Sequence, residues 1–365
     1  MTNDINGAPK PKPKFDEITL LKMIALASVL LFHCYRPFLG EGSFWKVVID
    51  SKADYLTYLY HFNKVFDVHC LFFCSGFLYF MTMAGGNRSV RDQLIKRVRR
   101  IVVPYFTVGT LFFIPMYTLF SVPSGLHLAD DSLWEGYRKF FCLIFSDHLW
   151  FLQNMLIITV ICLLLNFMIR KFFPVLLALS FLASYAFYAI PGSVRFMSLC
   201  SLTDNLFIFV LGGAVYMYYK YLTPKVNAAV MLSSAVLFLT CYNLQVPKNW
   251  LYPAVSMLTA GSACVCALTL ARYFASGAMS FLYKSPLIRF YDRNFMGFYM
   301  YHMPIPLICA LYLYKPFTEH VADSNVLYII AAWIITFALS AVAVKAGALI
   351  KSQCTRIGFI KALYS

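Results

Sequence analysis

Five ionisable residues lie inside apolar stretches of the sequence, where charge is costly: Lys22, His33, Asp67, His69 and His302. Such a group at the centre of a bilayer costs about 3 kcal/mol or more, so it usually faces a cavity or a partner and marks a functional site. Lys22 and His33 are eleven residues apart, which is almost three helical turns. Both would therefore lie on one face of a helix, about 16 Å apart along its axis. A histidine at that depth can accept and return a proton, because its unperturbed pKa is about 6.5.

Two of these residues also have a simpler interpretation, and the roles of the acidic residue and its neighbour are linked. Lys22 could extend its ammonium to the lipid head groups, and His33 could hydrogen-bond a neighbouring helix. Asp67 could orient His33 or balance its charge. His69 is rotated by about 200° from Asp67 on a helix, so we do not expect both to serve one site equally.

The composition indicates which class of protein positions these residues. Of the 365 residues, 61% are hydrophobic and 13% are charged, and the mean hydropathy is +0.68. An ordinary soluble domain is roughly 45–50% apolar and about 25% charged. This balance excludes a disordered chain, a nucleic-acid-binding module and a typical cytosolic enzyme. We expect an all-α, polytopic membrane protein whose net charge of +15 resides in its loops.

Membrane-spanning helices need about 20 mostly apolar residues. The sequence contains ten such runs, at 18–38, 60–84, 101–122, 149–169, 173–190, 204–221, 226–243, 251–275, 295–314 and 326–350. The alternation of a membrane β-barrel does not recur. Eleven cysteines are present, but none has zinc-site spacing and most lie in apolar runs, so neither a metal site nor a disulfide framework is expected.

Charge distribution orients these spans. With residues 1–17 placed in the cytosol, 20 of the 31 basic residues fall in inside segments and 9 outside, which fits the positive-inside rule. We therefore predict a disordered cytosolic tail over 1–17, a transmembrane domain over 18–351 and a cytosolic tail over 352–365. No cleavable signal peptide is evident, so the first span would be an uncleaved anchor in a cell membrane, such as the bacterial inner (plasma) membrane.

Five segments in order carry a family resemblance: LKMIALASVLLFH (21–33), VFDVHCLFFCSGFLYF (65–80), KRVRRIVVPY (96–105), HLWFL (148–152) and GFYMYH (297–302). Together they resemble the membrane-bound acyltransferase type 3 family across nearly the whole chain. That family usually has arginine where this chain has Lys22, and often serine where it has Phe295. Lysine keeps the charge but loses the planar fork that grips phosphate or carboxylate at two points.

The resemblance implies transfer of an acyl group, most often acetyl, from cytosolic acetyl-CoA or another acyl-CoA to a hydroxyl of a cell-envelope or lipid-linked carbohydrate. The expected partners are therefore acyl-CoA, a glycan acceptor and membrane lipids, without metal or nucleic acid. His33 would be the general base, with Asp67 beside it. The donor would contact a set that is mostly basic: Lys22, Arg97, Arg99, Arg100, Tyr299 and His302. The acceptor would contact His148, Trp150, Ser75 and His69.

Other interpretations of these motifs remain open. Gly76 could bring two helices into close contact beside Ser75, and Trp150 could belong to an interfacial aromatic belt. The basic loop could be only a topology signal that attracts anionic lipid. At the level of the whole protein, the alternatives are a transporter or flippase for an envelope glycan, or a non-catalytic subunit of an envelope-synthesis complex.

Overall fold

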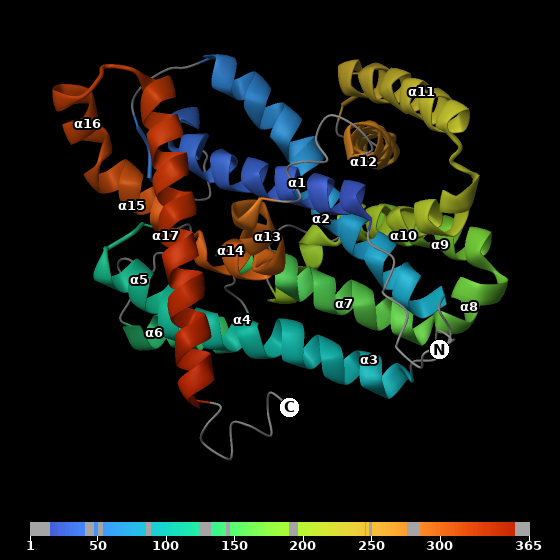
Figure 1. Ribbon diagram of the computed structural model, residues 1–365, viewed down its shortest axis with the longest axis horizontal. Helices are drawn as coiled ribbons and strands as arrows, with labels where there is room; N and C mark the ends of the chain where they lie inside the picture. The colour runs from blue at the N-terminus through green and yellow to red at the C-terminus, as the bar shows by residue number, and fades with distance from the viewer. Residues whose placement is uncertain are drawn as a thin grey trace.

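The computed structural model describes residues 15–40, 47–49, 54–84, 89–123, 133–143, 147–189, 196–244, 246–247, 250–275 and 285–354. Within these ranges the regular structure is entirely helical (Figure 1). Eight helical stretches there are long and apolar enough to cross a membrane: Asp16–Leu39, Tyr55–Met83, Val90–Leu119, Asp147–Leu164, Met197–Tyr221, Pro224–Asn243, Tyr252–Ala275 and Asn325–Ile350. The predicted class, an all-α polytopic membrane protein, is confirmed.

The α-helices follow in chain order and are labelled in Figure 1. They are α1 (Asp16–Tyr35), α2 (Asp54–Ala84), α3 (Val90–Arg97), α4 (Val103–Val108), α5 (Ile114–Leu119), α6 (Leu133–Phe141), α7 (Trp150–Leu164), α8 (Asn166–Lys171), α9 (Phe173–Phe187), α10 (Thr203–Tyr218), α11 (Pro224–Asn243), α12 (Tyr252–Ala275), α13 (Pro286–Arg293), α14 (Phe295–Tyr301), α15 (Ile305–Tyr312), α16 (Tyr314–His320) and α17 (Asn325–Cys354).

Each of the eight long stretches corresponds to a predicted span, with one notable shift. The third begins at Val90 rather than at residue 101, because the charged segment α3 continues into the apolar run through π-helical turns. The run 173–190 forms the shorter helix α9. Residues 1–14 and 355–365, which hold most of the two predicted tails, lie outside the described residues.

The run 295–314 is interrupted rather than being one continuous helix. Helix α14 ends at Tyr301 and α15 begins at Ile305. Pro304 lies in the gap and Pro306 in the first turn of α15. A proline has no amide hydrogen, and its ring clashes with the carbonyl one turn earlier, so two prolines two residues apart end a helix. The break places His302 at the end of α14.

Helices α2 and α10 cross with their backbones in close contact. A Cβ atom on Gly76 would overlap the carbonyl oxygen of Phe209, and one on Gly212 would overlap that of Phe73. Small residues let helix backbones touch in a membrane, where dispersion rather than the hydrophobic effect joins helices. The interpretation of Gly76 as a helix-contact residue is therefore confirmed, and this crossing fixes the position of α2, which carries Asp67 and His69.

Candidate active site

Three histidines from distant parts of the chain meet inside the helix bundle. His33 lies near the end of α1, His148 in the turn before α7, and His302 directly after α14. The ring centroids of His33 and His302 are 5.0 Å apart, as are those of His148 and His302. The three residues are 6%, 2% and 0% exposed. We call them the histidine cluster.

Hydrogen bonds fix the tautomers of two of these rings. The Nδ1 atom of His302 lies 2.6 Å from the carbonyl oxygen of Tyr299, and Nε2 of His148 lies 3.1 Å from that of Met300. A carbonyl oxygen only accepts, so these two nitrogens carry the hydrogens. A neutral imidazole then keeps a basic lone pair on its other nitrogen. Those atoms, Nε2 of His302 and Nδ1 of His148, are buried and have no hydrogen-bond partner within the described ranges.

Aromatic and acidic side chains surround the cluster. The Tyr299 hydroxyl donates a hydrogen bond to the carbonyl oxygen of His148, and the Tyr117 hydroxyl donates to the carboxylate of Asp147. Asp67 is 5% exposed, accepts from the amide of the next residue, and interacts electrostatically with Tyr299. Tyr299 thus links Asp67 to His148 and His302, and the predicted pairing of Asp67 with His33 stays a prediction.

Lys22 is held by a carboxylate rather than extending freely to the membrane surface. Its Nζ lies 2.7 Å from Oδ1 of Asp292 on α13, and the side chains are 19% and 30% exposed. Its Nζ also lies 4.9 Å from the ring centroid of Phe295. The interpretation that Lys22 only extends its ammonium to the lipid head groups is therefore incomplete. The ammonium forms a partly buried ion pair and also lies beside an aromatic ring.

The predicted basic group lies at the same end of the bundle as Lys22. The Arg97 guanidinium lies 5.5 Å from the ring centroid of Tyr79 on α2, and Lys22 interacts electrostatically with Cys74 on the same helix. Five residues separate these α2 positions, or about 7.5 Å along the axis. Arg99 and Arg100 are exposed. Arg99 and Arg100 are therefore accessible to an anion, and Arg97 contacts α2 about 7.5 Å along the axis from the level of Lys22.

His69 belongs to a second polar group, away from the histidine cluster. Its Nδ1 lies 3.0 Å from the Val65 carbonyl oxygen, and its Nε2 lies 3.5 Å from the Asp204 carboxylate. Asp204 also accepts from Tyr188 at 2.5 Å and from Ser256 at 3.0 Å. This group joins α2, α10 and α12 with the end of α9. Asp67 also interacts electrostatically with His69, so the expectation that the two would not serve one site equally stays a prediction.

The remaining predicted residues lie in the aromatic packing around the sites. Ser75 is half-buried beside Gly76, about 12 Å along α2 from Asp67. Trp150 is half-buried, with its ring centroid 6.2 Å from that of Phe72. Their predicted contacts with an acceptor stay predictions.

Sequence reasoning missed two acidic residues that organise these groups. Asp292 lies between predicted spans, so its carboxylate gave no sign of pairing with Lys22. Asp204 is the first residue of the predicted run 204–221. The criterion that selected Asp67, an ionisable group within an apolar run, would have selected Asp204 had it been applied to the ends of the runs.

Metal chemistry has no set of ligands in the described part of the chain. No group of three or more His, Cys, Asp or Glu side chains there is placed to hold a metal ion.

Comparison with known proteins identifies the family. The family model described as an acyltransferase domain matches residues 15–345, which is nearly the whole chain and includes every residue of both sites. Comparisons with curated proteins and with solved structures gave no match. Helices of membrane-spanning length, buried proton acceptors and the family match agree, and the chain belongs to the membrane-bound acyltransferase type 3 family of acyl-transfer enzymes.

Proposed function

We propose that this acyltransferase is an O-acyltransferase, moving an acetyl or related acyl group from cytosolic acyl-CoA to a hydroxyl of a cell-envelope or lipid-linked carbohydrate. The observation that carries the proposal is the histidine cluster, in which two buried rings keep a basic nitrogen that has no hydrogen-bond partner among the described residues. Acyl transfer to a hydroxyl needs such a base, because the attacking oxygen must lose its proton.

The proton and the electron pairs can be followed through the step. The acceptor oxygen attacks the thioester carbonyl carbon while His33 takes the hydroxyl proton. A carbon–oxygen bond forms, the carbon–sulfur bond breaks, and the departing thiolate receives the proton from the cluster. His302 is close enough to His33, and His148 to His302, to relay that proton and its charge. Asp67 would balance it through Tyr299.

The donor would bind at the end of the bundle that carries Lys22. Coenzyme A bears several phosphate charges, and guanidinium and ammonium groups form charge-assisted hydrogen bonds with phosphate. Lys22, Arg97, Arg99 and Arg100 would bind these phosphates, with Lys22 exchanging Asp292 for the donor. The extended pantetheine arm would then cover the distance of about 16 Å along α1 between Lys22 and His33.

The acceptor would approach the histidine cluster from the opposite end of α1. His148 and Trp150 are the predicted residues nearest that approach, because they begin α7 beside the cluster. His69 is engaged with Asp204, so its contacts give no support to an acceptor role. The excess of basic residues in the predicted inside loops supports an orientation with both termini in the cytosol of a cell-membrane protein.

Label transfer by the purified protein tests this function. Wild type, His33→Ala and His320→Ala would each be incubated with radiolabelled acetyl-CoA and a crude envelope-glycan extract. His320 is exposed and lies outside the cluster, so its variant is the matched control. We expect transfer by wild type and control, and a loss of about 100-fold or more in His33→Ala. Equal labelling by His33→Ala would contradict its role as base, whereas no transfer from any of several acyl-CoAs would contradict the proposed donor.

A further inference from the structure

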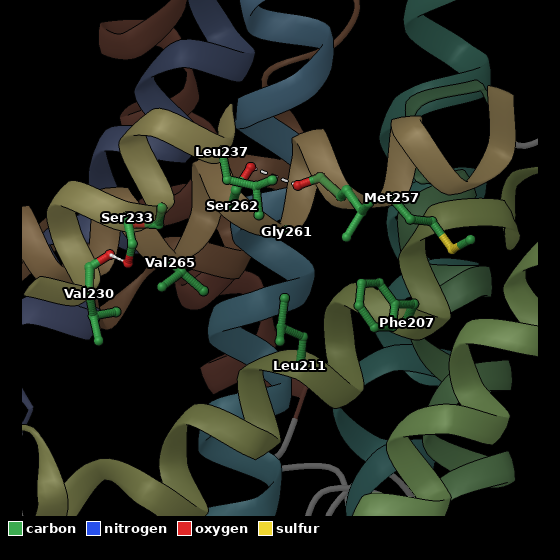
Figure 2. Close-up of a pocket in the computed structure, with 11 residues that line it drawn as sticks. Phe207, Leu211, Val230, Ser233, Leu237, Met257, Gly261, Ser262 and Val265 are labelled. Carbon is green, nitrogen blue, oxygen red and sulfur yellow. Dashed lines mark hydrogen bonds between the residues drawn. The ribbon is translucent and has the colours of Figure 1, made fainter. Parts of the chain in front are cut away.

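A groove lies between α10, α11 and α12, separate from the histidine cluster (Figure 2). Among the described elements, α12 is the one helix against which α11 packs extensively, and α11 lies at the periphery of the bundle (Figure 1). The space left between α11 and α10 has a volume of about 320 Å³. Its walls include Phe207 and Leu211 of α10, Leu237 of α11, and Met257 and Val265 of α12.

The lining is mostly apolar, and its three serines donate their hydroxyl hydrogens to backbone carbonyls rather than to a ligand. The Ser233 hydroxyl donates to the Ala229 carbonyl at 2.9 Å. Those of Ser234 and Ser262 donate to carbonyl oxygens of their own helices, at 3.0 and 2.6 Å. Figure 2 shows two such bonds running along the helices rather than into the groove. Water needs two or more polar partners to occupy a cavity, so these walls favour neither water nor a charged molecule.

The depth of the groove places it in hydrocarbon. The lining residues of α11 and α12 lie more than a turn from both ends of their helices, and all three helices belong to membrane-spanning stretches. Leu232 and Leu239, on the other side of α11, are 67% and 56% exposed, so lipid surrounds this helix. An empty space there would forfeit dispersion contacts on both of its walls.

The size of the groove suits part of an aliphatic chain. An apolar cavity of about 150 Å³ takes up one benzene molecule, so by proportion this groove has room for about a dozen carbon atoms. Gly261 maintains its depth, because a Cβ atom there would already lie 3.0 Å from a methyl carbon of Leu211. Met257 at one end supplies a side chain that adapts to irregular shapes.

We propose that this groove binds one acyl chain of a membrane phospholipid as an ordered ligand, which fills the space between α10 and α11 and fastens α11 to the bundle. The inference is independent of the donor and acceptor proposed above. It depends on the apolar lining, the satisfied serines and the mid-membrane depth.

Photolabelling tests the site. The full-length protein in detergent would receive a phospholipid that carries a diazirine in its acyl chain, and labelled residues would be mapped by mass spectrometry. Ser233→Phe fills the groove from an exposed position, and Leu232→Phe places the same ring one residue away on the opposite side of α11. We expect labelling to concentrate on the lining of α10, α11 and α12, to fall severalfold in Ser233→Phe, and to persist in Leu232→Phe.

Three results would overturn the assignment. If the groove were labelled no more strongly than α17, which faces lipid, the probe would be contacting the protein only as bulk lipid. Labelling unchanged in Ser233→Phe would place the chain elsewhere. Displacement of the probe by a polyprenyl-linked saccharide, but not by excess phospholipid, would assign the groove to a lipid-linked acceptor instead. If Ser233→Phe does not elute as a folded protein, Val230→Phe replaces it, because Val230 lies on the same wall of the groove. The same severalfold loss of labelling is expected.

Discussion

The imidazole rings of His33 and His302 lie 5.0 Å apart although they belong to helices at opposite ends of the chain. His302 reaches this position because α14 ends at Tyr301, and its ring is anchored by Nδ1 to the Tyr299 carbonyl. The second ring nitrogen is thereby left basic and buried. The arrangement makes the proposed base one member of a group whose other members have defined tautomers.

Two substitutions test the basic nitrogen of each ring while keeping the hydrogen-bond donor that anchors it. An asparagine amide at position 302 keeps a donor near Nδ1, and a glutamine amide at 148 keeps one near Nε2, but neither side chain provides a basic nitrogen. We expect His302→Asn and His148→Gln each to lower kcat by about 100-fold. The melting temperature should change little in both variants, and the KM for the donor should change little in His148→Gln. An unchanged kcat in both variants would show that these histidines only pack in the bundle and take no part in proton transfer.

Lys22 should control use of the donor. A hydrogen bond to a charged group contributes about 1.5–3 kcal/mol, so Lys22→Ala should raise the donor KM by about tenfold or more. Lys22→Arg keeps the charge and should keep activity, as the family resemblance implies. Steady-state kinetics with varied acyl-CoA measures both. An alanine variant with unchanged donor dependence would leave Lys22 as the partner of Asp292 and nothing more.

Asp292 should compete with the donor for Lys22. Asp292→Asn removes the carboxylate that holds Nζ at 2.7 Å, and a partly exposed ion pair contributes up to about 1 kcal/mol. The donor KM should therefore fall by about fivefold. Glu17→Gln is the control, because Glu17 accepts from the Tyr219 hydroxyl instead. A rise in KM together with lower stability would show that Asp292 only neutralises a lysine in the membrane.

The second polar group should stabilise the fold without taking part in transfer. Asp204→Asn removes the carboxylate that His69 contacts and weakens the bonds from Tyr188 and Ser256. Disturbing buried hydrogen bonds of this kind costs about 1–3 kcal/mol. We expect a lower melting temperature and unchanged activity per folded molecule. A specific rise in the acceptor KM would instead support the contact with His69 that the sequence predicted.

The α2–α10 crossing should tolerate no added methyl group. Gly76→Ala places a Cβ atom on the Phe209 carbonyl, which cannot move without its helix. Overpacking of this kind costs about 1–3 kcal/mol or more. Gly261→Ala meets only side-chain atoms, the nearest being a methyl carbon of Leu211 at 3.0 Å, and should lose much less. Thermal unfolding of the two variants in the same detergent compares them, and equal losses would contradict the backbone contact.

Apolar length alone was enough to predict the membrane class and most spans, because the cost of exposing polar backbone to lipid leaves few alternatives. The same criterion selected His33, Asp67 and His302 one by one. It could not predict that His148 and His302 lie beside His33, since no periodicity relates residues on different helices. The pairing of Lys22 with Asp292 was hidden for the same reason. The two prolines at 304 and 306 indicate a helix break in the sequence, but a criterion based on hydropathy alone does not detect prolines.

The histidine cluster draws its members from the first helix, the turn before α7 and the residue after α14. During synthesis, the first of these enters the membrane long before the last has left the ribosome. If the cluster is the proposed base, the capacity to move protons would therefore arise only after α14 has been made, and a fragment that ends before His302 would lack it.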